Sequence, residues 1–112
     1  MKYMLLLYSD PQAGEAAMEE WFAYTEALAT AGVLLGGDAL HGIDQATTVR
    51  VRDGERLTSD GPFAETKEIL GGYYLIDVSD LDAAMDWAAK VPLAPFGSVE
   101  VRPLVGFDAP TD

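Results

Sequence analysis

The sequence predicts an α+β fold in which two β-α-β units flank an inserted β-hairpin. Two segments carry apolar side chains at helical spacing, and two others are apolar on both faces, as buried strands are. Asp53-Gly54 joins two segments of alternating side chains, which is typical of a two-residue hairpin turn. We expect one domain over residues 1–112, because this length is typical of a single domain.

The first β-α-β unit begins with a continuous apolar run over residues 3–8, which indicates a strand buried on both faces. Residues 15–31 are predicted to be helical, and Gly32 allows the left-handed conformation with which many helices end. Residues 33–35 begin the second strand. The apolar stripe of the helix is expected to comprise Met18, Trp21, Phe22, Thr25 and Leu28.

The inserted hairpin is predicted over residues 47–58. Val49 and Val51 share one face of its first strand, and Arg50 and Arg52 share the other, because successive side chains of a strand point to opposite sides. We expect the arginine face to be solvated.

The second unit contains a long strand over residues 69–78, in which Gly71-Gly72 indicates a bulge or a bend. Ser79 is the expected N-cap of the following helix, since serine often accepts a hydrogen bond at that position. The last strand is expected over residues 99–105, and Pro103 favours an edge position for it. The apolar stripe of the second helix should comprise Leu81, Ala84, Met85, Ala88 and Val91.

This element order predicts a homodimer. Two helices that pack on one side of the sheet leave its other face bare, yet the strands at 3–8 and 73–78 are apolar on both faces. A second copy of the same sheet is the simplest structure that could bury the bare face.

Composition excludes several classes of function. The chain has 19 acidic and 7 basic residues and a net charge of -12, which disfavours binding to nucleic acids and to anionic membranes. It has no cysteine and one histidine, so we expect no metal site, and its paired glycines lack the spacing of a phosphate-binding loop. We therefore expect no cofactor. The apolar run near the N-terminus is too short for a membrane span, and we expect a cytoplasmic protein.

The most informative motif is Asp60-Gly61-Pro62-Phe63, followed by Glu65, Lys67 and Glu68 and closed by Gly71-Gly72-Tyr73. It resembles the signature of the DGPF-domain proteins within the YCII-related family. Residues 2–6, 46–54 and 99–103 agree with the same family, so the resemblance covers nearly the whole chain.

The resemblance implies a ferredoxin-like α+β fold whose sheets pair across a dimer as an α+β barrel. It implies no established activity for this branch, although a His–Asp pair has led to proposals that YCII-related proteins are enzymes. Relatives with this barrel include isomerases and monooxygenases of small aromatic molecules, and DGPF proteins often accompany sigma factors of the extracytoplasmic-function type. This chain departs from the YCII pattern in its first helix, which has no histidine, since His41 is the only one.

Two residues are candidates for acid–base catalysis. Asp60 has a structural interpretation, in which it caps a rigid turn that Phe63 anchors in the core. In the functional interpretation the turn directs Asp60 into a pocket as a general acid or base. His41 lies in a loop-like stretch and is either a surface residue or, if it faces Asp60, the best acid–base candidate.

Other residues are candidates for ligand binding. Lys67 and Glu65 either form a surface ion pair or hold and orient an anionic ligand. Tyr8 and Tyr73 are either core or interface residues or the polar tips of a pocket for a flat molecule, and Phe63 would contribute an aromatic surface to that pocket.

We therefore expect a protein that binds a small acidic or aromatic compound and acts by cofactor-free proton transfer, as an isomerase or a lyase does. The alternative is a non-enzymatic interaction or regulatory module, linked to a sigma factor of the extracytoplasmic-function type, whose acidic surface meets a basic partner.

Overall fold

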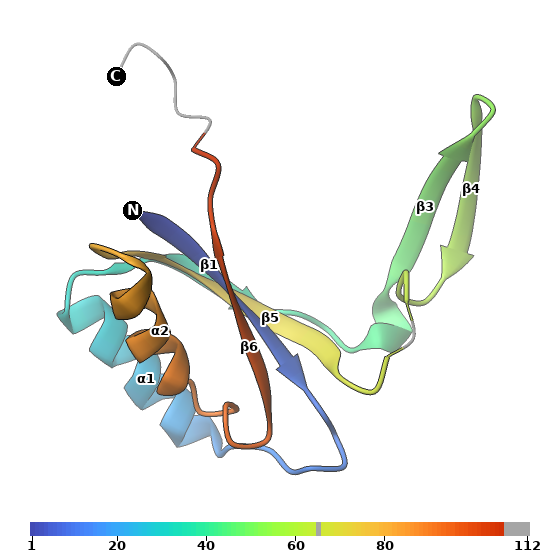
Figure 1. The fold of residues 1–112 in the computed structure, drawn as a ribbon. Coiled ribbons are helices and arrows are strands. Elements are labelled where there is room, and N and C mark those ends of the chain that lie inside the picture. Colours follow the sequence, from blue (N-terminus) through green and yellow to red (C-terminus); the bar gives the residue numbers. More distant parts are fainter. Residues whose placement is uncertain (65, 107–112) are drawn as a thin grey trace.

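The computed structural model of the chain describes residues 1–64 and 66–106. Four strands form an antiparallel sheet in the order β2-β5-β1-β6, with two helices on one face (Figure 1). This is the ferredoxin-like α+β arrangement that the sequence predicts. The strands of the sheet are β1 (Lys2–Ser9), β2 (Leu34–Ala39), β5 (Ile69–Asp77) and β6 (Gly97–Pro103), and the helices are α1 (Met18–Thr30) and α2 (Leu81–Ala89).

A hairpin of β3 (Thr47–Arg52) and β4 (Glu55–Asp60) forms a separate two-stranded sheet that stands away from the body (Figure 1). A short 3₁₀ helix, η1 (Ile43–Gln45), leads into it. Asp53 and Gly54 both have positive φ, at 52° and 75°, as the predicted two-residue turn requires. The projecting hairpin raises the radius of gyration to 16.2 Å, against about 13 Å for a compact domain of this length.

The core lies between the sheet and the helices. Tyr3, Leu5 and Leu7 alternate along β1 and are all buried, because they point toward the helices. Leu28 of α1 and Ile76 of β5 are fully buried in the same cluster. The central position of β1, which pairs with both β5 and β6, follows from its continuous apolar sequence.

The predicted face of α1 is wrong in part. Met18 and Phe22 are exposed, and the side chain of Phe22 is 69% exposed. Tyr24 takes their place in the core, because its ring packs edge-on against Tyr74 and its hydroxyl donates to the carbonyl oxygen of Trp87 at 2.8 Å. The helix therefore rests on Trp21, Tyr24, Thr25 and Leu28, which follow the i, i+3, i+4, i+7 spacing.

The start of α2 also differs from the prediction. Asp80 is the N-cap instead of Ser79, and its carboxylate accepts a hydrogen bond from the backbone N–H of Ala83 at 2.9 Å. Leu81 and Met85 are half-exposed, so the helix packs through its small residues Ala84 and Ala88.

Two predicted features of the four-stranded sheet are confirmed. β6 is an edge strand, as Pro103 indicates. A register shift places a bulge at Gly71, since Leu7 pairs with Gly72 but Tyr8 pairs with Leu70. On the hairpin, in contrast, Val49 and Val51 are exposed and Arg50 is partly buried, so the expectation of a solvated arginine face does not hold for Arg50.

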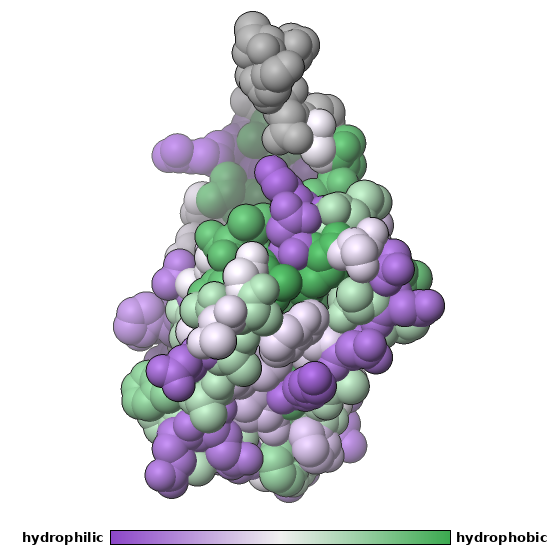
Figure 2. Space-filling view, turned by 90° about the vertical axis from the view of Figure 1, so that its left-hand side faces the viewer, coloured by the Kyte–Doolittle hydropathy of each residue, from purple (hydrophilic) through white to green (hydrophobic). Residues whose placement is uncertain are grey.

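The second face of the sheet is open in the single chain. Met4 and Leu6 of β1, with Tyr73 and Leu75 of β5, point away from the helices and are partly exposed. The helix side of the molecule, in contrast, mixes hydrophilic and hydrophobic side chains (Figure 2). In the described part of the chain, no helix is long and apolar enough to cross a membrane.

Burial, and to a smaller extent the neighbouring Tyr74, raises the pKa of Tyr24 well above its ordinary value of 10.0. The folded state keeps the Tyr24 proton at a pH where the unfolded chain loses it. This contribution to the free energy of unfolding is therefore complete below pH 10 and is lost as the pH rises further. We expect the melting temperature to fall steeply above pH 10.

Tyr24→Phe should lower the melting temperature at pH 7, because a hydrogen bond worth about 1 kcal/mol is lost, and should flatten the alkaline decline. Tyr3→Phe is the control and should keep the steep decline. Equal alkaline slopes for the wild type and Tyr24→Phe, measured by circular dichroism, would contradict this account.

Candidate functional site

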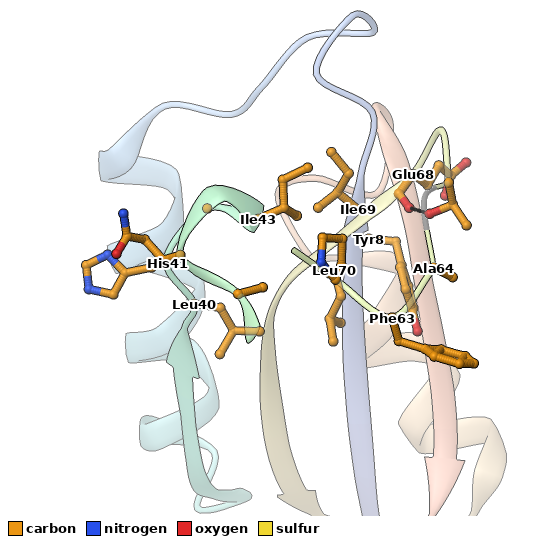
Figure 3. Close-up of a pocket in the computed structure, with 14 residues that line it drawn as sticks. Tyr8, Leu40, His41, Ile43, Phe63, Ala64, Glu68, Ile69 and Leu70 are labelled. Atoms are coloured by element: carbon orange, nitrogen blue, oxygen red, sulfur yellow. Dashed lines mark hydrogen bonds between the residues drawn. The ribbon is translucent and has the colours of Figure 1, made fainter. Parts of the chain in front are cut away.

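A cavity of about 870 Å³ lies where the sheet ends and the hairpin begins (Figure 3). Its wall is mostly apolar, with a few polar groups at separate points. The lining comes from the end of β1, the segment that contains η1, the loop after β4 and the start of β5, and comprises Tyr8, Leu40, His41, Gly42, Ile43, Gln45, Ala46, Pro62, Phe63, Ala64, Thr66, Glu68, Ile69 and Leu70.

The floor of the cavity belongs to the open face of the sheet. Tyr8 of β1 pairs with Leu70 of β5, and both side chains point away from the helices, as those of Met4 and Leu6 do. The backbone N–H of Leu40 donates to the carbonyl oxygen of Gly71 at 2.9 Å, which holds the segment after β2 beside this floor.

Gly61 connects the hairpin to the cavity wall. Its N–H donates to the carbonyl oxygen of Ala46 at 2.8 Å, and its own carbonyl oxygen accepts from Oγ1 of Thr48, also at 2.8 Å. Its φ of +97° is in the region that glycine adopts far more readily than other residues. The glycine of the motif is therefore needed for the loop to turn beneath the hairpin and carry Pro62 and Phe63 to the cavity.

Phe63 does not anchor the turn in the core, so that prediction is wrong. Its side chain is 75% exposed and lies at the edge of the cavity (Figure 3). The reason is that the hairpin and the following loop stand off the body, so the single chain has no core for this ring to enter. Its contact is with Arg50 of β3, whose guanidinium carbon lies 5.3 Å from the ring centre.

The predicted site residues separate into groups. Tyr8, His41 and Phe63 line the cavity, with His41 and Phe63 on opposite sides of it (Figure 3). Tyr73 instead lines a smaller cavity of about 280 Å³, near Trp21 and Asp38. Glu65 lies outside the described residues.

Asp60 and Lys67 line neither cavity. Asp60 is exposed as the last residue of β4, and the carboxylate has no hydrogen-bond partner among the residues that the structure describes. Nζ of Lys67 lies 3.5 Å from Oδ2 of Asp10, and the side chain of Lys67 is 79% exposed. Their roles in binding or catalysis stay predictions.

Sequence reasoning missed most of the apolar lining. Leu40, Ile43 and Leu70 are partly exposed and isolated in sequence, so each on its own looks like an ordinary surface or strand residue. Glu68 was recognised as part of the motif, but its half-buried place in the cavity wall was not predicted. Across residues 1–64 and 66–106, no group of three or more histidine, aspartate or glutamate side chains is arranged to hold a metal ion.

Comparison with known proteins places the chain in a family. Residues 1–108 match the family described as the YCII-related domain. The chain is also similar to an uncharacterised protein of Rhizobium meliloti (strain 1021), with 40% identity over 114 residues that cover 93% of this chain and 92% of the relative.

Replacing Gly61 by alanine should destabilise the protein, because alanine is strained at a φ of +97°. We expect a loss of about 1–3 kcal/mol in the free energy of unfolding, measured by urea denaturation. Gly36→Ala is the matched control: a Cβ at either glycine meets no atom within 4 Å, and only Gly61 has a positive φ. Equal stabilities for the two variants would show that the turn does not depend on this conformation.

Proposed function

The chain belongs to the YCII-related family, and we propose that it binds a small aromatic or acidic molecule in the cavity beside the hairpin. The similar protein of Rhizobium meliloti is uncharacterised. The observation that carries this proposal is the cavity itself. Its volume of about 870 Å³ is within the range of small-molecule sites. An apolar wall with a few separated polar groups is also what such sites have in common.

The proposed chemistry is proton transfer without a cofactor, as in an isomerase or a lyase. His41 supports it because histidine exchanges a proton most readily near neutral pH and because it lines the cavity. The hydroxyl of Tyr8 and the carboxylate of Glu68 are further polar groups of the lining that could orient a substrate. Asp60 remains a proposed acid–base residue on the strength of the motif, and Lys67, Glu65 and Tyr73 remain proposed ligand contacts.

We further propose that the chain is a DGPF-type member of the family and that it forms a homodimer through the open sheet face, as in a dimeric α+β barrel. The support is the row of partly exposed apolar side chains on that face, which include Met4, Leu6 and Leu75. Burying such side chains against a second copy would remove them from water.

The alternative proposal is an interaction or regulatory module that contacts a sigma factor of the extracytoplasmic-function type. The net charge of -12 supports it, because an acidic surface attracts a basic partner and the attraction weakens with salt. The same binding experiment separates the two proposals.

The binding proposal predicts that small phenols, carboxylic acids or quinone-like compounds raise the melting temperature of the wild type. A compound at 100 times its Kd stabilises by about 2.7 kcal/mol, which shifts the melting temperature by several degrees. Ala64→Trp places a large ring in the cavity wall and should abolish the shift. Ala23→Trp, on the exposed side of α1, should keep it.

If no compound of these classes stabilised the wild type, the small-molecule proposal would be rejected in favour of the protein-partner alternative. A shift that survives in Ala64→Trp would place binding outside the cavity.

The dimer proposal predicts a mass of twice the 12.0 kDa of one chain by light scattering at micromolar concentration. Leu6→Glu puts a charge on the open sheet face and should give a monomer, because an unpaired charge is costly to bury. Phe22→Glu, which alters an exposed apolar residue on the helix side, should remain a dimer. A monomeric wild type would contradict the proposal.

A further inference from the structure

We propose that Arg50, stacked on Phe63 at the edge of the cavity, recognises a carboxylate, so that the ligand is an aromatic carboxylate. This inference rests on the proposed function, because it names the class of molecule that the cavity binds. It assigns the anion-binding role to a residue outside the Asp60–Glu68 motif.

The position of Arg50 is well defined by its neighbours. It lies on the same face of the hairpin as Thr48, whose hydroxyl is bonded to Gly61 at the start of the loop. The loop then carries Phe63 beneath the guanidinium, 5.3 Å from the ring centre. A guanidinium over an aromatic ring gains a cation–π contact and keeps its N–H groups free to donate in its own plane.

Arg50 forms no ion pair in the described part of the chain, although the sequence contains 19 acidic residues. Its side chain is nevertheless only partly exposed. A guanidinium without a carboxylate partner is suited to bind a carboxylate from a ligand, because two parallel N–H···O bonds match that geometry.

Arg52 shares the face of Arg50, but its guanidinium donates to the carbonyl oxygen of Val51 at 3.0 Å, and three other basic residues are engaged elsewhere or face away. Lys67 pairs with Asp10, and the ammonium of Lys90 lies 5.0 Å from the ring centre of Trp87 on α2. Arg56 pairs with Val51 across the hairpin, so it points to the face opposite Arg50. Arg50 does not itself line either cavity, and it contacts the lining of the larger one through Phe63.

The rest of the lining fixes how such a ligand would lie. Ile69 and Leu70 of the lining offer an apolar surface to a ring, and Arg50 beside Phe63 is the cation that could hold the carboxylate. The carboxylate is therefore expected at the Arg50–Phe63 edge with the ring over the floor. His41 lies on the side opposite Phe63, at the end of the cavity remote from the carboxylate, and its ring points outward (Figure 3).

A positive charge at the binding point is also needed because the protein as a whole is acidic. A chain with a net charge of -12 repels anions at long range, so an anionic ligand needs a specific cation at the binding point. The three arginines of the hairpin, Arg50, Arg52 and Arg56, supply most of the basic charge in this region, and Arg50 is the one in contact with a residue of the cavity.

The test compares benzoate with phenol, which share a ring and differ in charge, by calorimetric titration of the full chain. We expect benzoate to bind the wild type more tightly than phenol. Arg50→Gln should raise the Kd of benzoate by about tenfold or more, because a charge-assisted hydrogen-bonded pair is lost. The same variant should change the Kd of phenol less than twofold. Arg50→Lys should recover only part of the benzoate affinity, because lysine lacks the planar fork.

Arg56→Gln is the matched control, since it removes the same charge from the opposite face of the same hairpin and should leave both affinities unchanged. Unchanged melting temperatures would show that the variants are folded. Tight phenol binding with no effect of Arg50→Gln on benzoate would overturn this inference and leave the proposed function standing. Equal losses for Arg50→Gln and Arg56→Gln would also overturn it, and the failure of both probes to bind the wild type would overturn both proposals.

Discussion

Two hydrogen bonds at Gly61 hold the β3–β4 hairpin and the cavity wall in one arrangement. One links its N–H to Ala46, before β3, and the other links its carbonyl oxygen to the side chain of Thr48, within β3. The loop after β4 is thereby folded back against the base of the hairpin. Pro62 and Phe63 reach the cavity, and Arg50 reaches Phe63, because this turn is closed. The start of the Asp60–Glu68 motif therefore connects the hairpin to the ferredoxin-like body.

The cavity lies at this connection for a physical reason. The ends of β1 and β5 present Tyr8 and Leu70 on a sheet face that no helix of the described chain covers. The projecting hairpin supplies a second wall but no core of its own, so apolar groups such as Phe63 stay partly exposed between the two. An exposed apolar surface rimmed by polar groups is the usual sign of a binding surface. Ligand binding and pairing of two chains both use this side of the molecule in our account.

Much of the fold was predictable from local rules. The Asp53-Gly54 turn, the edge position that Pro103 favours and the bulge at Gly71-Gly72 all follow from backbone preferences that act over a few residues. The face of α1 was harder, because Phe22 and Tyr24 are both aromatic and only the tertiary contacts with Tyr74 and Trp87 select Tyr24 for the core.

The site was less predictable than the fold. The lining of the cavity comes from three segments that are distant in sequence, at Tyr8, residues 40–46 and residues 62–70, so no local pattern marks Ile43 and Leu70 as neighbours. Phe63 was expected in the core because large aromatic residues usually are buried, and the projecting hairpin that leaves it exposed has no sequence signal beyond its turn. Five residues of the stretch 60–68 do line the cavity: Pro62, Phe63, Ala64, Thr66 and Glu68.

The most direct test of the central claim is a titration of the ¹⁵N-labelled chain with phenol, followed by nuclear magnetic resonance of the backbone amides. The account predicts saturable shifts confined to Tyr8, the segment 40–46 and the described residues of the loop and strand start between 62 and 70. Shifts that cluster instead around Tyr73, Trp21 and Asp38 would place the site in the smaller cavity. The absence of saturable shifts would contradict the claim that this cavity binds small aromatic molecules.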